Sequence, residues 1–93
     1  MIIGACTLEL MIYEANSLKE KRQVIKSIVE RIKSRYNVSI AEVGLNDIWR
    51  SAVLGIACVS NDTIHAKKMI SSVIKFIDRD GRVEIIRHEI EIL

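Results

Sequence analysis

Residues 49–60 read WRSAVLGIACVS, and this stretch decides the fold. An extended chain points alternate side chains to opposite faces. Both sets are apolar or small here: Ala52, Leu54, Ile56 and Cys58 on one face, and Val53, Gly55, Ala57 and Val59 on the other. A strand with two apolar faces is central in its sheet or has its open face covered. The segment therefore predicts an inner strand.

A helix is predicted directly after this strand. Ser60, Asn61 and Asp62 offer an N-cap. Apolar residues then recur at helical spacing, and they are Ala66, Met69, Ile70, Val73, Phe76 and Ile77. Residues 78–81 form a turn, in which Gly81 ends the helix.

A second helix is predicted over residues 18–36, ended by Asn37. Ser17, followed three residues later by Glu20, matches a capping box. Apolar residues follow at helical spacing: Leu18, Ile25, Ile28, Val29, Ile32 and Tyr36.

Three more segments, residues 2–13, 38–43 and 82–93, have the character of strands. In the last one the apolar phase changes between Ile85 and Ile86, which indicates a bulge or burial on both sides. The element order is then βαββαβ. It predicts one α+β domain over residues 1–93: a ferredoxin-like sandwich with a four-stranded antiparallel sheet and both helices on one face. The first and third strands would be central.

Composition excludes several classes of protein. Apolar residues make up 49% of the chain, which argues against disorder. No stretch approaches the roughly 20 apolar residues of a membrane span. The apolar start MIIGACTLELMIY lacks a basic segment and contains Glu9, so we expect no signal peptide. These features predict a cytoplasmic protein with no membrane partner.

Positive charge is concentrated on the first helix. Residues 17–36 hold seven of the 14 basic residues against two glutamates, a local net charge of +5 in a chain of net charge +2. Lys19, Lys26 and Lys33 repeat every seven residues, so they line one flank, and Arg22 lies beside them. Lys21 falls near the buried side, where its stem can snorkel.

Two interpretations of this helix stay open. Lysine and arginine are common on the solvated face of an ordinary helix. Alternatively, a row of cations neutralises phosphates along a nucleic-acid backbone. The candidate nucleic-acid-binding residues are Lys19, Lys21, Arg22, Lys26 and Lys33. The open sheet face is nearly free of aromatic residues, so stacking of RNA bases is not supported.

The uncovered sheet face suggests a second kind of surface. It would carry small and apolar side chains, namely Ile3, Ala5, Val53, Gly55, Ala57 and Val59. Such a patch would be large for a monomer. We therefore expect a homodimer interface on this face, in a domain that is either structural or a regulatory domain that binds a small ligand there. Glu9 lies on the same face and needs water or a cationic partner, for example from another subunit.

Catalytic chemistry has little support. Cys6 and Cys58 lie in apolar phases of neighbouring strands, which favours inert core thiols over a redox or metal role. His65 and His88 lack the neighbours that a metal site requires. There is no phosphate-binding glycine loop. We therefore expect no cofactor, no metal and no enzyme activity.

Three motifs together resemble the YlxP-like family, a bacterial domain of unknown function (domain of unknown function 503). They are SLKEKR at residues 17–22, NVSIAEV at 37–43, and VSND at 59–62. The resemblance spans essentially the whole chain. It implies a ferredoxin-like fold, assigns no catalytic residue, and favours an RNA or ribosomal partner. Residues 17–22, with Glu42, Asp47 and Trp49, carry over as shared positions.

Overall fold

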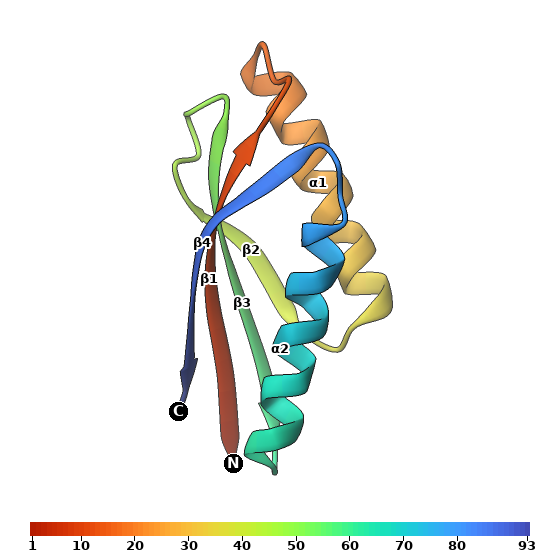
Figure 1. The fold of residues 1–93 in the computed structure, drawn as a ribbon, viewed down its shortest axis with the longest axis vertical. Helices are drawn as coiled ribbons and strands as arrows, with labels where there is room; N and C mark the ends of the chain where they lie inside the picture. The colour runs from red at the N-terminus through yellow and green to blue at the C-terminus, as the bar shows by residue number, and fades with distance from the viewer.

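The computed structural model describes residues 1–93, and its elements follow the order βαββαβ (Figure 1). They are β1 Ile2–Ile12, α1 Leu18–Arg35, β2 Ser39–Gly44, β3 Ser51–Ser60, α2 Thr63–Asp78 and β4 Val83–Ile92. The predicted bounds of the first helix and of the strands differ from these by no more than two residues. Neither helix combines the length and the apolar composition that a membrane crossing requires.

The four strands form one antiparallel sheet in the order β2-β3-β1-β4. The long central pair, β1 and β3, places Gly4 opposite Cys58 and Ala5 opposite Ala57. Both helices lie on the same face of the sheet, and the other face is open (Figure 1). The ferredoxin-like sandwich predicted from the element order, with the strand at residues 49–60 in an inner position, is therefore confirmed.

The core lies between this sheet and the two helices. Its strand residues alternate with exposed or half-buried ones, as the two-residue period requires. The sheet contributes Cys6, Leu8, Leu10, Ile12, Ile40, Ala52, Leu54, Ile56, Cys58 and Val83, and the helices contribute Ile25, Ile28, Ile32, Ala66, Ile70, Val73 and Ile77. Aliphatic side chains fill the core, because the chain has few aromatic residues.

Polar side chains cap both helices. The Ser17 hydroxyl accepts a hydrogen bond from the backbone N–H of Glu20 at 3.1 Å. The Glu20 carboxylate accepts one from the N–H of Asn16 at 2.7 Å, so the capping box closes one residue earlier than usual. Asp62 caps α2 by accepting from the N–H of Ile64 at 3.3 Å. These contacts satisfy N–H groups that a helix start leaves free.

The edge strand β4 contains a bulge. Glu9 of β1 pairs with Arg87, whereas the next residue, Leu10, pairs with Ile85. Ile86 is therefore an extra residue in β4. The bulge explains the change of apolar phase in this strand, and of the two explanations offered by the sequence it is the correct one.

Candidate nucleic-acid interface

Four cationic side chains on α1 form what we call the basic column: Lys19, Arg22, Lys26 and Lys33. All four are exposed. Only Lys26 has a carboxylate nearby, with its Nζ 4.0 Å from Oε1 of Glu30, and both of these side chains are largely in solvent. Exposed pairs of this kind contribute little to stability. The charges of the column are therefore not used to hold the domain together.

Lys21 is not part of this exposed surface. Its side chain is 0% exposed, although its place in the helix start suggested a charge that reaches solvent. The Nζ lies 2.8 Å from Oε2 of Glu42 on β2, and it donates to the carbonyl oxygens of Leu45 at 2.6 Å and Asn46 at 3.3 Å. The assignment of Lys21 as a nucleic-acid-binding residue is thus wrong, because no surface of its ammonium is free.

The pair of Lys21 and Glu42 fastens α1 to the loop between β2 and β3. The Glu42 side chain is 17% exposed, and its buried Oε2 has Lys21 as its neighbouring cation. The ammonium donates hydrogen bonds to the two carbonyl oxygens and forms an ion pair with Oε2 of Glu42, which accepts no hydrogen bond. Burial of a lone charge costs several kcal/mol, so each partner depends on the other.

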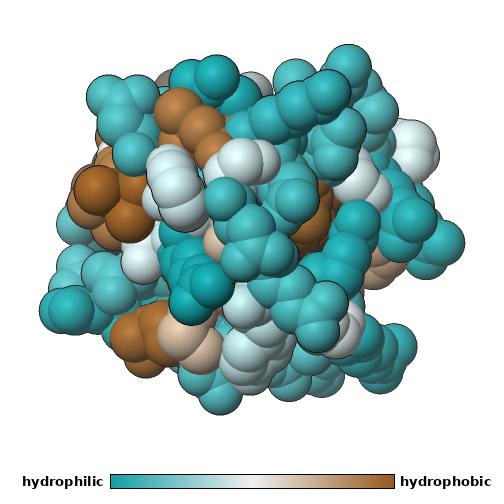
Figure 2. Space-filling model, turned by 90° about the horizontal axis from the view of Figure 1, so that it is seen from above, coloured by the Kyte–Doolittle hydropathy of each residue, from teal (hydrophilic) through white to brown (hydrophobic).

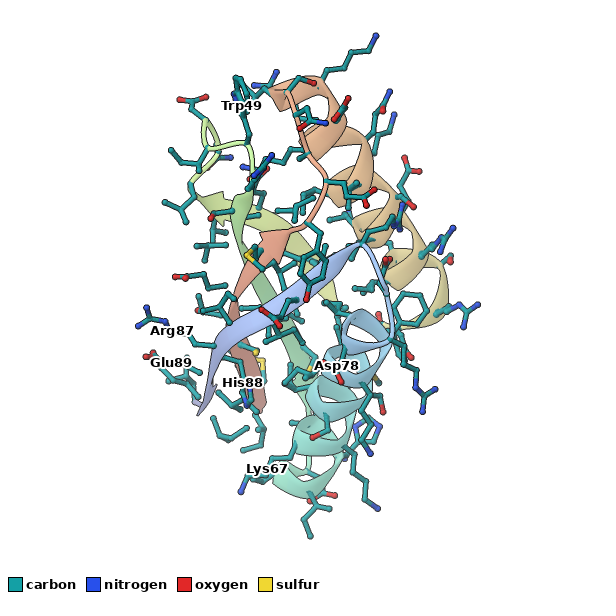
Figure 3. The ribbon with its side chains drawn as sticks, turned by 45° about the horizontal axis from the view of Figure 1, so that its top comes forward. Trp49, Lys67, Asp78, Arg87, His88 and Glu89 are labelled. Carbon is teal, nitrogen blue, oxygen red and sulfur yellow. The ribbon has the colours of Figure 1, made fainter.

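The β2–β3 loop exposes apolar side chains above this pair. Leu45, at a φ of 59°, is 43% exposed, Ile48 is 50% exposed and Trp49 is 53% exposed. Trp49 sits at the end of the molecule beside the start of α1 (Figure 3). About half of Trp49 remains in solvent, so its large ring is not buried in the core of its own domain.

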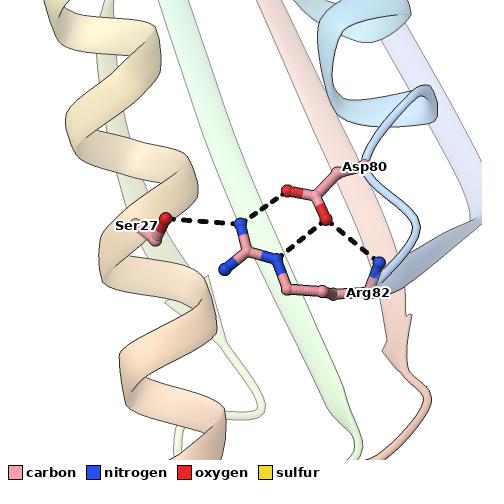
Figure 4. A network of polar contacts seen from close by, with 3 residues as sticks. All are labelled: Ser27, Asp80 and Arg82. Carbon is pink, nitrogen blue, oxygen red and sulfur yellow. Dashed lines mark hydrogen bonds and ion pairs between the residues drawn. The ribbon is translucent and has the colours of Figure 1, made fainter.

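A second polar cluster joins the turn before β4 to α1. The Arg82 guanidinium donates to Asp80 through Nε at 2.9 Å and Nη2 at 2.7 Å, and Nη2 also donates to the Ser27 hydroxyl at 3.3 Å (Figure 4). Arg82 holds the pKa of Asp80 below its ordinary value, and Arg31 adds to this effect. Sequence reasoning missed this cluster. The spacing of Asp80 and Arg82 was its only signal, and Ser27 is far away in the chain.

The six residues proposed as an interface all belong to the sheet face opposite the helices. Val59 is 66% exposed, and the others, Ile3, Ala5, Val53, Gly55 and Ala57, are half-buried. A bulge in β2 brings Val43 over Gly55, where a Cβ would lie 3.0 Å from Cγ1 of Val43. This half of the face is a shallow, mostly apolar surface.

The other half of the same face is charged. Glu9 lies 3.8 Å from Arg87, its neighbour on β4. Arg87 and Glu89 point away from the helices (Figure 3). Glu9 therefore has its cationic partner within the chain, so its charge does not require a partner from a second subunit.

The remaining candidates for chemistry are dispersed. Cys6 and Cys58 are free thiols in the core, and burial raises the pKa of Cys6. The Cys58 sulfur contacts the carbonyl of Ala66 at 3.9 Å. His65 interacts with the Ser60 hydroxyl at 3.2 Å, whereas His88 is exposed on β4. No three His, Cys, Asp or Glu side chains come together as metal ligands would.

Fold and surface together define a small ferredoxin-like domain with one basic helix turned to solvent. The chain belongs to the family described as "Protein of unknown function (DUF503)", whose model matches residues 3–90. It is 42% identical over 83 residues to the uncharacterized protein YlxP of Bacillus subtilis (strain 168), an alignment that covers 89% of this chain and 90% of that protein. The resemblance found from the three motifs is thereby confirmed.

Two designed proteins share the fold. One is the de novo designed protein LFR1 1 with ferredoxin fold, at a TM-score of 0.58 and 15% identity, over 98% of this chain and 86% of the other. The second is the de novo designed protein Foldit4, at a TM-score of 0.55 and 14% identity, over 100% and 97%. At such low identity these likenesses concern the architecture alone.

Proposed function

We propose that this protein is a non-enzymatic binding module that holds RNA by its phosphate backbone through the basic column. The observation that carries the proposal is the state of Lys19, Arg22, Lys26 and Lys33: all are exposed, and only one has a carboxylate within 4.0 Å. The opposite side of α1 packs against the sheet, so the fold does not require these four charges.

The length of the column suits a polyanion. Lys19 and Lys33 are 14 residues apart, which is about 21 Å along a helix. Contacts from a row of cations reach phosphates rather than base edges, and such contacts position a nucleic acid without reading its sequence. Since Lys21 is buried, four phosphate contacts are the most that this column offers.

A salt series tests the proposal. Binding of a fluorescent RNA duplex, measured by anisotropy, should weaken with salt along a log–log slope of roughly −3 to −4 for four contacts. The double variant K19E/K26E should bind much more weakly and lose about two units of slope. K67E/K68E is the matched control, since it changes the same charge on exposed lysines of α2.

Two results would contradict the proposal. One is the absence of binding at low salt by the wild-type protein. The other is an equal loss of affinity in K67E/K68E and K19E/K26E, which would reflect net charge and not the column. Circular dichroism of each variant verifies that the fold is intact, and this is expected because all four lysines are exposed.

A second candidate function is homodimerisation through the open sheet face. The specific observation is the register of small residues, with Ala5 opposite Ala57 and Thr7 opposite Gly55. At Ala5 and Ala57 such short side chains let another sheet approach closely, whereas over Gly55 the exposed Val43 offers an apolar contact instead. The β4 side of the face carries charges of both signs, Arg87 and Glu89, so a second copy related by a two-fold axis can complement them.

Light scattering at micromolar concentration tests this candidate. A dimer that Val53→Glu converts to a folded monomer would support it, since the new carboxylate would be buried in the interface. A strict monomer would count against it. Thr7→Glu, on the same face but nearer the charged half, serves as the comparison and should have the smaller effect.

A further inference from the structure

A hollow lined by arginines lies between the C-terminal ends of the two helices. Its volume is about 590 Å³. The residues that line it are Arg31, Arg35, Phe76, Arg79, Asp80, Gly81 and Arg82. Four of these seven are cations and one is an anion. None of them belongs to the basic column.

The single carboxylate is already occupied by one of the arginines. Asp80 makes two side-chain contacts to Arg82 and also accepts from its backbone N–H at 3.0 Å (Figure 4). Arg31, Arg35 and Arg79 have no carboxylate oxygen within 4.0 Å. Asp80 influences Arg31 only from beyond contact distance. The hollow therefore presents three guanidinium groups that no carboxylate contacts directly.

Two of the arginines are held in place before any ligand arrives. The Arg35 guanidinium lies 5.0 Å from the centre of the Phe76 ring, and the edge of Tyr36 packs on the same ring at 6.1 Å between centroids. Arg82 is fixed between Asp80 and Ser27. A guanidinium that is already ordered loses less entropy on binding, and its forked donors match the oxygens of a phosphate.

A purely structural explanation covers only part of this cluster. Arg35 ends α1 and Arg79 follows α2, where cations favour the helix dipole. Arg31 lies before the last turn of α1, so the dipole does not explain it. The three exposed arginines border the same hollow, so a bound anion would reduce the repulsion between them.

We propose that this arginine hollow binds a phosphomonoester, such as the terminal phosphate of an RNA or the phosphate of a free nucleotide. A phosphomonoester carries a charge of about −1.5 to −2 at pH 7 and offers three acceptor oxygens. A phosphodiester carries only one charge and suits three unpaired guanidiniums less well. The site shares no residue with the basic column, so it can be tested independently of RNA backbone binding.

Amide chemical shifts in NMR spectra test the site, with inorganic phosphate as the probe and chloride at equal ionic strength as the reference. Phosphate should shift the amides of residues 27–35 and 76–82. R31Q/R79Q should weaken this binding at least about tenfold, since two charge-assisted contacts are lost. K67Q/K68Q should leave it within about twofold.

Further ligands identify the source of the phosphate. Adenosine monophosphate should shift the same amides, and adenosine should not. A 5′-phosphorylated RNA should bind R31Q/R79Q more weakly than it binds the wild type. If only adenosine monophosphate or only the 5′-phosphorylated RNA binds at the hollow, that ligand identifies the source of the phosphate, and the result supports the site. Equal shifts with chloride, or unchanged phosphate binding in R31Q/R79Q, would overturn it.

One more variant separates the two proposals. K19E/K26E should lose affinity for RNA duplex and keep its phosphate-induced shifts at the hollow. If K19E/K26E abolishes the phosphate shifts while R31Q/R79Q retains them, the anion binds at the column and the hollow is not a phosphate site. If the wild-type protein binds phosphate at the hollow but does not bind RNA duplex, the proposal of RNA backbone binding is refuted and the phosphate site stands.

Discussion

At the scale of single residues, Lys21 shows how a charge can serve the fold. Six other cations of α1 are exposed, yet this one is enclosed by Glu42 and two backbone carbonyls of the β2–β3 loop. A buried ammonium is tolerated there because an opposite charge and two carbonyl acceptors surround it. The pair therefore specifies how the loop sits on the helix.

Replacement of Lys21 by methionine should be strongly destabilising. The change keeps an apolar stem but leaves Glu42 without its cation and frees the carbonyls of Leu45 and Asn46. We expect a loss of about 3 kcal/mol in the free energy of unfolding, measured by urea denaturation. Adding Glu42→Gln should restore part of this loss, because no unpaired charge then remains.

A small loss for Lys21→Met, similar to that for the exposed Lys26→Met, would contradict this view. It would mean that Glu42 recovers its hydration by turning outward. The comparison is fair, because both substitutions remove one ammonium from the same helix.

The ion pair of Asp80 and Arg82 should make stability depend on pH. The pKa of Asp80 lies below its ordinary value of 3.8, so the pair stabilises the fold above that pH and is lost as the pH falls toward the depressed value. Since Arg82 is 41% exposed, solvent weakens the pair, and Asp80→Asn should cost only about 1 kcal/mol near pH 7.

Urea denaturation of wild type and Asp80→Asn at several pH values provides the measurement. The difference between the two proteins should shrink as the pH falls below about 4, because Asp80 of the unfolded chain takes up a proton there while the folded carboxylate, with its lowered pKa, is protonated only at still lower pH. A difference that stays constant down to about pH 2 would show that the charge of Asp80 is not what stabilises the turn.

At the scale of elements, the approach of α2 to the sheet depends on a glycine. A Cβ at Gly4 would lie 3.1 Å from the Cys58 sulfur and 3.4 Å from Cβ of Ala66. Small residues on β1 and on the facing helix therefore let the two backbones come close. Overpacking at such a contact forces a shift of the neighbouring element.

Gly4→Ala should lower the free energy of unfolding by about 2 kcal/mol, because the added methyl meets core atoms on several sides. Combining it with Cys58→Ala should recover part of the loss by removing the nearest atom. Gly81→Ala is the control, since no atom lies within 4 Å of its Cβ position and its φ is not positive. Equal losses at Gly4 and Gly81 in thermal unfolding would refute the packing explanation.

Much of the element structure was predictable because its signals are local. Alternation along residues 49–60 predicted the central strand, and Ser17 predicted the start of α1. The phase change at Ile86 indicated a bulge or burial on both sides, and the structure shows the bulge. The partners of Lys21 were not predictable, because Leu45 and Asn46 are 24 and 25 residues away and bind through backbone oxygens. The arginine hollow was missed for the same reason: it joins two helix ends that only the folded chain brings together.

At the scale of the whole molecule, the two sides differ in their balance of charge, although β4 also carries the cation Arg87. The cations of α1 lie on the helix side, whereas Glu84, Glu89 and Glu91 are exposed on β4 at the edge of the sheet. Seen from above, most of the exposed hydrophobic areas lie on the sheet side of a largely hydrophilic surface (Figure 2). A polyanion should therefore approach the helix side.

This asymmetry predicts which charges matter for RNA affinity at physiological salt. The Debye length there is about 8 Å, so E89K/E91K on β4 should change the affinity for RNA duplex by less than about threefold. K19E/K26E should reduce the same affinity by more than about tenfold. If E89K/E91K strengthens binding as much as K19E/K26E weakens it, the RNA lies across β4 and not along α1.

The enclosure of the Lys21 ammonium has a practical consequence for chemical labelling. An amine-reactive acylating reagent should modify Lys19, Lys26 and Lys33 at once, because their amines are in solvent. Lys21 should react only during moments when the β2–β3 loop lifts away from α1. The labelling rate of Lys21, followed by mass spectrometry of peptides, would thus report how often that loop opens in an otherwise native molecule.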